Sequence, residues 1–205
     1  MRPPGPRAGR GRRERLGPGL PAVARLRGRP RRSGALAFVH RIVRSGSRNH
    51  PYTRFMSDIT IRRATADDSK RLTRLVRSSG AYRGDYAAMV EGYQVGGPYI
   101  EHHPVFVAVD DADDGRVLGF YALLVDEAEL DLAFVADAAQ GLGIGRLLME
   151  HMTQQARAAG LDSVRVVAHP PAEEFYLRTG AVRTGAVPPT GRIHWERPEL
   201  RYDVA

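Results

Sequence analysis

The sequence predicts one α/β domain that follows a basic N-terminal tail. Strand-like runs alternate with helical patterns from residue 59 to the C-terminus. Three consecutive strand-like runs between residues 105 and 135 are separated only by short turns, which is typical of an antiparallel meander. The last of these runs leads through a glycine-rich turn into a helix. A domain of about 150 residues is large enough for a single hydrophobic core.

The first third of the domain predicts a strand followed by two helices. Residues 59–64 alternate between apolar and polar side chains, the pattern of a half-buried strand. Thr65 precedes two acidic residues, a helix N-terminal signal, and leucines at helical spacing follow. A second apolar stripe predicts a helix over residues 85–93, and Gly96-Gly97-Pro98 is expected to end it.

The later elements continue this alternation. In chain order they are three strands at residues 105–109, 116–125 and 129–135, and a helix that ends at about residue 159. A buried strand at residues 163–168, a short helix at 172–178 and a closing strand at 200–204 follow. Asp114-Gly115 is a hairpin signal within the meander. The predicted order is therefore β-α-α-β-β-β-α-β-α-β.

Charge divides the chain into two parts. Residues 1–55 contain fifteen arginines and one acidic residue, a net charge of +14. Residues 56–205 contain sixteen basic and twenty-two acidic residues, a net charge of −6, so the two parts add to the +8 of the whole chain. The first segment has few large apolar residues and cannot offset the entropy of ordering its chain. We therefore expect residues 1–55 to be disordered and residues 56–205 to form the domain.

Three explanations of the basic tail stay open. It is an arm that neutralises nucleic-acid phosphates, a targeting segment, or an upstream misreading of a gene whose translation begins at Met56. We favour the last, because Met56 lies three residues before the first predicted strand. Nucleic acid is then expected as a partner only through the tail.

Composition also excludes several classes of protein. The chain has no cysteine, which rules out disulfides, thiolate metal sites and cysteine nucleophiles. It has no apolar run near the ~20 residues that cross a bilayer, so a membrane is not expected as a partner. These features predict a soluble, cytoplasmic protein.

The glycine-rich turn Gln140-Gly141-Leu142-Gly143-Ile144-Gly145 predicts an anion site. Glycines let a ligand approach the backbone, and the N–H groups and dipole of the following helix favour negative charge. A pyrophosphate suits such a site. The spacing differs from the G-x-G-x-x-G of dinucleotide sites, and the Gly-Lys-Ser/Thr ending of the P-loop is missing.

The same turn resembles the Q/R-x-x-G-x-G/A signature of the GNAT N-acetyltransferase family, whose element order matches residues 59–203. The resemblance implies the GNAT fold, a mixed, mostly antiparallel twisted sheet flanked by helices. It implies that acetyl-CoA is the co-substrate, without a metal, and that the acceptor is an amine of a small molecule or peptide. It also makes a homodimer an expected assembly.

A second stretch, Ala172–Ala181, resembles the A-x-x-F-Y-x-x-x-G-F segment of the same family. The resemblance implies that Tyr176 is the general acid toward the leaving thiolate. It further implies a set of coenzyme A contacts: Phe134, Val135, Gln140, Gly141, Leu142, Gly143, Ile144, Gly145, Arg146, Ala172 and Phe175. The sequence departs from the family at Asp137, where proline is usual, at Pro171, and at Ala181, where phenylalanine is common.

The general base and the acceptor pocket have several candidates. Glu129 and Asp131 occupy alternate positions of one predicted strand and share a face, either as catalytic carboxylates or as a solvated surface. His169, at the end of the next strand, is another candidate base. Tyr82 and Tyr86, with Tyr93 and Tyr99 nearby, are expected to line the acceptor pocket. A non-catalytic module that senses acyl-CoA, tethered to nucleic acid by its tail, is the alternative function.

Overall fold

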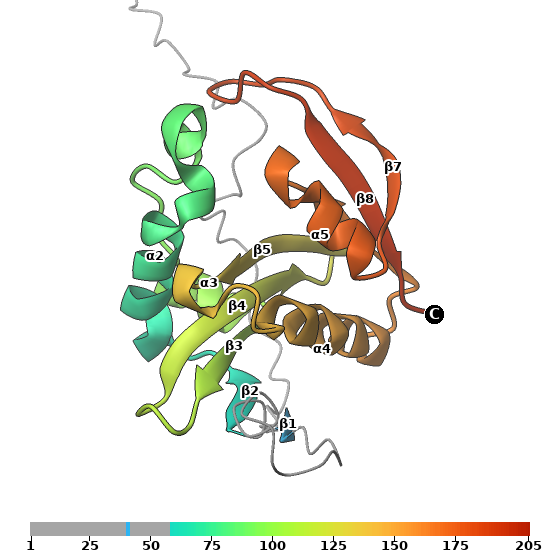
Figure 1. Ribbon diagram of the computed structural model, residues 1–205. Coiled ribbons are helices and arrows are strands. Elements are labelled where there is room, and N and C mark those ends of the chain that lie inside the picture. Colours follow the sequence, from blue (N-terminus) through green and yellow to red (C-terminus); the bar gives the residue numbers. More distant parts are fainter. Residues whose placement is uncertain (1–39, 42–57) are drawn as a thin grey trace, which may run out of the picture.

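The computed structural model describes residues 58–205 together with His40–Arg41, which form strand β1. The rest of the expected disordered tail lies outside the described residues. Eight strands form one sheet in the order β1-β2-β3-β4-β5-β6-β8-β7, and helices cover both of its faces (Figure 1). Within the described residues, no helix is both long and apolar enough to cross a membrane.

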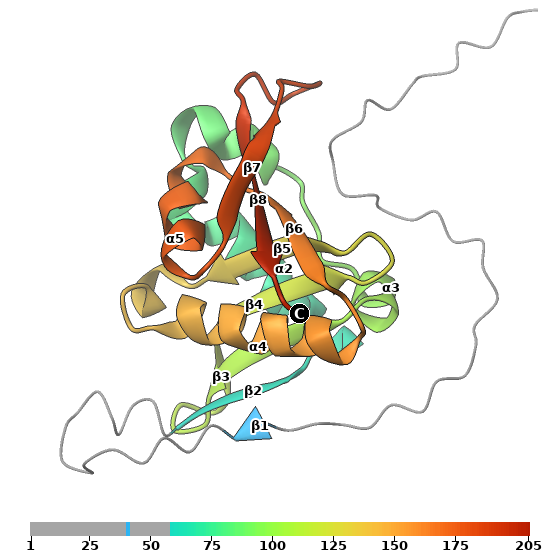
Figure 2. The ribbon, with the colours of Figure 1, turned by 90° about the vertical axis from the view of Figure 1, so that its right-hand side faces the viewer.

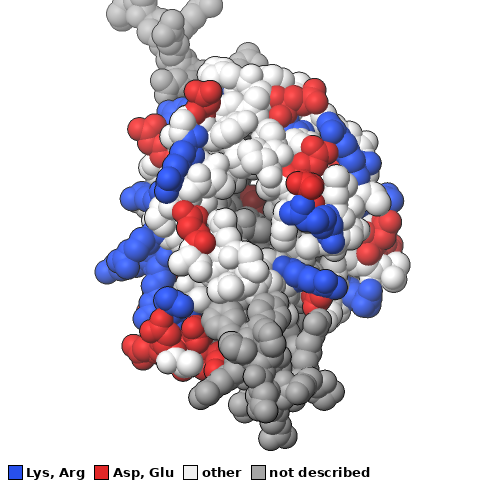
Figure 3. Space-filling view, in the orientation of Figure 1, with Lys and Arg blue, Asp and Glu red and all other residues white. Residues whose placement is uncertain are grey.

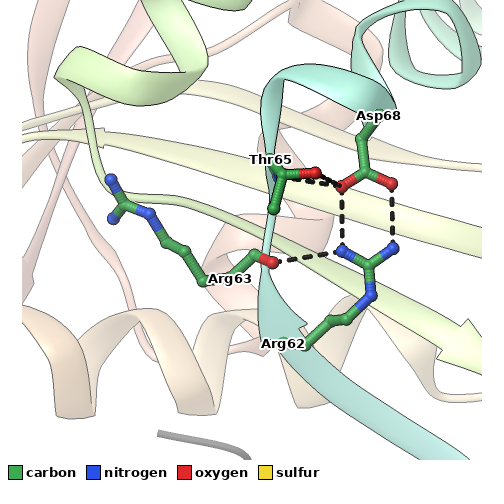
Figure 4. A network of polar contacts seen from close by, with 4 residues as sticks. All are labelled: Arg62, Arg63, Thr65 and Asp68. Carbon is green, nitrogen blue, oxygen red and sulfur yellow. Dashed lines mark hydrogen bonds and ion pairs between the residues drawn. The ribbon is translucent and has the colours of Figure 1, made fainter. Parts of the chain in front are cut away.

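The N-terminal part of the domain holds strand β2 (Ile59–Arg63), the 3-10 helix η1 (Ala66–Asp68) and helix α2 (Ser69–Ser78). The predicted N-terminal signal is confirmed, because the Thr65 N–H donates to the Asp68 carboxylate at 2.9 Å. That carboxylate also accepts two hydrogen bonds of 2.8 Å from the Arg62 guanidinium (Figure 4). Asp68 is buried, so this network fixes the passage from β2 into α2.

The connection after α2 differs from the prediction. In place of a helix over residues 85–93 there are two 3-10 helices, η2 (Gly80–Tyr82) and η3 (Gly84–Met89). Helix α3 (Gly97–His102) begins where the sequence was expected to end a helix. Pro98 lies in the first turn of α3, where its missing N–H costs nothing and its fixed φ suits a helix. The Gly-Gly-Pro signal therefore marked a helix start, and its interpretation as a stop was wrong.

The predicted meander is confirmed as strands β3 (Val105–Asp110), β4 (Arg116–Leu124) and β5 (Glu129–Val135), paired antiparallel. The register of β4 with β5 shifts so that Leu123 faces Leu130 while Ala122 faces Leu132. Asp131 is therefore left without an opposite residue, as in a β-bulge.

Two hydrophobic clusters flank this sheet. One packs helix α4 (Ile144–Ala158) against the sheet, and the other packs α2 and α3 against the opposite face. Figure 2 shows α4 in front of the sheet and α2 behind it. The central strands β3 and β4 are covered on both faces, which explains their nearly continuous burial.

The C-terminal part extends the sheet with β6 (Ser163–Val167), β8 (Arg197–Asp203) and β7 (Val182–Val187), and helix α5 (Glu173–Arg178) lies before β7. The sequence missed β7. Its residues, Val-Arg-Thr-Gly-Ala-Val, are mostly exposed on an edge strand and carry a weak hydrophobic pattern. The strand forms because β8 supplies a partner.

Candidate functional site

A cavity of about 470 Å³ opens where the sheet separates into two parts. Strands β5 and β6 run parallel and meet at a single residue pair, Glu129 with Arg165. Beyond that pair the strands diverge, and residues of both line the cavity. Figure 3 shows the corresponding hollow, with largely uncharged walls and acidic atoms deep inside.

The separation leaves one edge of β5 free to bind a ligand. The Ala136 N–H donates to the Leu118 carbonyl of β4 at 2.8 Å. Successive amides of a strand point to opposite edges, so the N–H groups of Ala133 and Val135 point away from β4, toward the cavity. An extended ligand that carries amides can pair with such an edge as an added strand would.

The glycine-rich turn follows directly after this edge. Gly141 and Gly143 have φ of 77° and 82°, the left-handed region that favours glycine. The Leu147 N–H makes the first helical bond, to the Gly143 carbonyl at 3.1 Å. The amides of Ile144, Gly145 and Arg146 therefore belong to the open first turn of α4, where the helix dipole favours an anion.

Phe175 packs closely against the start of α4. A Cβ atom built on Gly145 would lie 2.8 Å from the ring edge of Phe175, so a larger residue there would push the ring away. Phe175 and Gly145 both line the cavity, as does Ala172. Glycine at position 145 thus allows α5 to approach the helix that carries the anion site.

Tyr176 also lines the cavity, on the buried side of α5. Its ring contacts Phe175 at 5.2 Å and Tyr202 at 6.5 Å between centroids. Burial raises the pKa of Tyr176 well above its usual range, with smaller contributions from Tyr82 and Tyr202. The phenol is protonated at physiological pH, as it would be in water, and its hydroxyl can donate a hydrogen bond.

Asp131, the bulge residue of β5, presents a carboxylate to the cavity. The Tyr99 hydroxyl of α3 donates a hydrogen bond to it. Burial, together with the nearby charges of Glu129 and Glu127, raises the pKa of Asp131 to about 6, although the bond from Tyr99 acts in the opposite direction. A carboxylate with such a pKa is suited to accept a proton near neutral pH.

Glu129 takes a different place. It is not among the cavity-lining residues, and its carboxylate accepts a hydrogen bond of 2.6 Å from Arg165 on β6. Arg165 also contacts Glu199 of β8 at 2.5 Å. Glu129 thus ties together the strands where the two parts of the sheet still touch. Its carboxylate is committed to an ion pair, which argues against a role as base.

The helix η2 passes over the cavity and is fixed at two points. The Gly80 N–H donates to the Asp137 carboxylate at about 3.0 Å. The Ala81 carbonyl accepts from His169 Nε2 at 2.9 Å. Tyr82, the next residue, stacks on His169, with 4.6 Å between centroids, and also contacts Phe134. Asp137, where the GNAT resemblance predicts proline, therefore joins η2 to the loop that precedes the glycine-rich turn.

The contact with Ala81 defines the tautomer of neutral His169. Because a carbonyl only accepts, Nε2 carries the proton and Nδ1 holds a lone pair. Burial lowers the pKa of His169, with the bond to Ala81 opposing this shift. Its Nδ1 is buried and has no hydrogen-bond partner among the described residues.

Comparison with known proteins identifies the family. The family model of the acetyltransferase (GNAT) domain matches residues 99–190, which span the cavity strands and the glycine-rich turn. This chain carries a GNAT acetyltransferase domain. The predicted resemblance is confirmed, and the chain is an enzyme that transfers acetyl groups. The alternative of a non-catalytic acyl-CoA sensor finds no support.

Solved structures share the GNAT fold with this chain. A protein from Desulfovibrio desulfuricans assigned to the GNAT family is 21% identical, with a TM-score of 0.56 over 72% of this chain and 99% of its own. The protein yncA from Salmonella typhimurium, solved with its cofactor acetyl-CoA, is 19% identical, with a TM-score of 0.55 over 73% and 95%. A spermidine N-acetyltransferase chimera from Vibrio cholerae and hSSAT is 16% identical, with a TM-score of 0.56 over 72% and 96%. These likenesses establish the fold. No curated protein matched the sequence.

The GNAT cavity gathers most of the predicted site residues from separate elements. Those that line it are Asp131, Phe134, Val135, Gln140, Gly141, Gly145, Ala172, Phe175, Tyr176 and Tyr82. The other members of the turn have different surroundings. Leu142 and Ile144 pack into the core, and the exposed Arg146 pairs with Glu150 at 2.9 Å. Gly143, which caps α4, is not in the lining.

The acceptor side of the cavity differs in part from the prediction. Tyr86, expected to line the pocket, is not in the lining and lies edge-on to His169 and Trp195. Met89 and Ile193 line the cavity without having been predicted. No local sequence signal marks Ile193, because it lies in the connection between β7 and β8 and reaches the cavity only through the pairing of β8 with β6.

Proposed function

We propose that this GNAT domain transfers an acetyl group from acetyl-CoA to a primary amine. The observation that carries this proposal is the continuous path from the free edge of β5 to the open first turn of α4, with Tyr176 beside it. The pantetheine arm of coenzyme A contains amides, and its other end carries a pyrophosphate. The free edge of β5 suits the amides of pantetheine, and the N-terminus of α4, which follows it in the chain, suits the pyrophosphate.

Three features support a fit to the acetyl donor. Gly141 and Gly143 place no side chain at the two left-handed positions of the turn, and the space beside Gly141 is open, because a Cβ there would meet no atom within 4 Å. The amides of Ala133 and Val135 are available for pantetheine, while Phe134, Ala172 and Phe175 wall the cavity. Acetyl-CoA would supply an activated acetyl group as a thioester, whose C–S bond breaks as the new N–C bond forms.

Asp131 is the proposed general base. An amine with pKa near 10.4 is almost wholly protonated at neutral pH, which withholds the nucleophilic lone pair. Asp131 takes the proton from the ammonium, directly or through water, and its raised pKa brings it closer to the operating pH. We therefore assign the base to Asp131 and leave Glu129 to its ion pair with Arg165.

Tyr176 and the backbone of β5 complete the proposed mechanism. Tyr176 donates its phenolic proton to the departing thiolate sulfur. The Val135 N–H donates a hydrogen bond to the carbonyl oxygen on which negative charge develops, and a donor of this kind typically contributes about 3 kcal/mol. Holding both reactants in one cavity also raises the reaction rate above that in solution.

A thiol-release assay tests this function. The full chain is incubated with acetyl-CoA and a set of primary amines, and the acetylated product is identified by mass spectrometry. We expect amine-dependent thiol release above the slow hydrolysis seen without amine. Tight binding of acetyl-CoA in calorimetry, combined with no acetylated product from any amine, would contradict the proposal.

A further inference from the structure

The acceptor end of the cavity has an apolar wall. It is formed by the end of α2, the segment through η2 and η3, and the connection between β7 and β8. The wall residues are Val76, Tyr82, Met89, Val90, Tyr93 and Ile193. The phenol of Tyr82 is uncharged at neutral pH, and burial raises its pKa further, to about 12. Such a wall favours hydrocarbon or aromatic groups.

Charge in the cavity is sparse. Among the cavity-lining residues that the structure describes, Asp131 is the sole carboxylate and Arg178 the sole guanidinium. Arg178 is largely exposed and pairs with Glu174 at 2.9 Å, so its charge is satisfied at the surface. Burial lowers the pKa of His169, so this histidine is neutral at neutral pH. The interior therefore offers one negative charge, and one ammonium group neutralises it.

We propose that the acceptor is a small primary amine with a single positive charge on an apolar aryl or alkyl body. This inference rests on the proposed function and names its substrate class. The ammonium lies at Asp131, where the proton is removed, and the apolar body lies against Met89, Tyr82 and Tyr93. The acetylated nitrogen is neutral after transfer, which removes its attraction to Asp131 and favours release of the product.

Two other classes of amine fit this cavity poorly. A polyamine or aminoglycoside carries further ammonium groups, and each would lose its hydration against an apolar wall without a carboxylate partner. A peptide N-terminus brings several amides that need hydrogen-bond partners, and of the wall residues only Tyr82 and Tyr93 have side chains that can provide one. We therefore expect both classes to be weaker substrates than an amine with one charge and an apolar body.

The test compares amines of similar length and different charge. The full chain is assayed with hexylamine, hexamethylenediamine, phenethylamine, spermidine and a short unblocked peptide, and kcat/KM is obtained from thiol release and product mass. We expect hexylamine and phenethylamine to exceed hexamethylenediamine, spermidine and the peptide by about tenfold or more.

A carboxylate introduced into the apolar wall tests directly whether this wall contacts the acceptor. Met89→Glu adds a second carboxylate to the cavity, and we expect it to raise the ratio of kcat/KM for hexamethylenediamine over hexylamine by about tenfold. Gln94→Glu is the matched control, because Gln94 is exposed, lies outside the cavity and receives the same added charge. It should leave the ratio unchanged. Circular dichroism establishes that both variants are folded.

The possible results distinguish an error in the substrate class from an error in the proposed acetyl transfer. A preference of the unmodified enzyme for spermidine, the diamine or the peptide would overturn the substrate class and leave acetyl transfer to amines intact. An unchanged ratio in folded Met89→Glu would also overturn it, because the side chain would then not face the acceptor. Failure to acetylate any amine would overturn the proposed function and this inference together.

Discussion

At the level of single residues, Tyr176 owes its proposed role to its surroundings. A phenol is protonated at neutral pH in water as well, so what the fold adds is position: Tyr176 lies on the buried side of α5, in the cavity wall. The sequence marks the residue, and packing against Phe175 and Tyr202 fixes its place.

Replacing Tyr176 by Phe removes the proton donor and keeps the ring. We expect kcat to fall about tenfold or more, with little change in the Kd of acetyl-CoA, because the hydroxyl acts on the leaving group. Steady-state kinetics and calorimetry measure the two quantities. Tyr202→Phe is the control, since Tyr202 bonds Thr179 outside the cavity and should retain turnover. Unchanged kcat in Tyr176→Phe would remove this residue from the mechanism.

The role of Asp131 predicts a dependence on pH. A base must be ionised to accept a proton, so kcat/KM should fall as the pH drops through the Asp131 pKa of about 6. In Asp131→Asn this acid limb should vanish and kcat/KM should fall about a hundredfold. Glu127→Gln, which removes an exposed neighbouring carboxylate, should keep the limb and shift it slightly downward. Persistence of the limb in Asp131→Asn would assign it to another group.

At the level of elements, η2 connects the donor loop to the acceptor wall. Gly80 bonds Asp137, Ala81 bonds His169, and the next residue, Tyr82, lines the cavity. Ala substitution at Asp137 releases one of the two fixed points. We expect the KM for the amine to rise about tenfold with a smaller change in the Kd of acetyl-CoA, because Tyr82 loses its position. Kinetics with varied amine and calorimetry with acetyl-CoA measure this split.

Asp85→Ala serves as the control for Asp137→Ala. Asp85 is an exposed carboxylate on η3, in the connection that follows η2 but outside the cavity. Its removal should leave both constants unchanged. Equal effects of the two substitutions would attribute the change in KM to general charge and not to the position of η2.

The junction of β2 with α2 predicts a dependence of stability on pH. Burial alone would raise the pKa of Asp68, but hydrogen bonds from Arg62 and the Thr65 N–H outweigh it and lower the pKa. A lowered folded-state pKa contributes stability above the unfolded value near 3.9, and this contribution is lost as the pH falls through the folded value. Asp68→Asn should therefore cost about 2 kcal/mol at neutral pH and much less in acid, measured by urea unfolding.

The neighbouring Asp67 provides the control for that measurement. It is exposed, so Asp67→Asn should change the free energy of unfolding by no more than about 0.5 kcal/mol. A loss at Asp68 that is the same at acid and neutral pH would show that shape, and not charge, determines its contribution.

At the level of the whole molecule, the cavity exists because the sheet separates between β5 and β6. The two parts are joined by the ion pair of Glu129 with Arg165 and by the hydrogen bond from the Arg165 N–H to the Ala128 carbonyl, and η2 contacts His169 across the cavity. A ligand that fills the gap should bind the folded state alone. At about a hundredfold excess over Kd, acetyl-CoA should stabilise the protein by about 2.7 kcal/mol, seen as a higher Tm. An equal concentration of ADP, which has a pyrophosphate but no pantetheine, should stabilise it less.

Local patterns predicted most of the fold. The meander, α4, β6 and α5 follow from strong periodicity and from glycine turns, and their predicted order was confirmed. The misread segments have weak local preferences. Residues 84–89 form a 3-10 helix against the core, and β7 is an exposed edge strand that forms by pairing with β8. In both places a partner distant in sequence decides the structure.

By itself the sequence determined the family and the glycine-rich turn and marked Tyr176 as the candidate acid, because each depends on residues adjacent in the chain. Only the tertiary structure distinguished Asp131 from Glu129, since a β-bulge and an ion pair with Arg165 give two neighbouring carboxylates different environments. It likewise decided the acceptor wall, where α2, the segment through η3 and the connection between β7 and β8 meet. Charge and burial in a cavity depend on every element that surrounds it, and no single stretch of sequence records them.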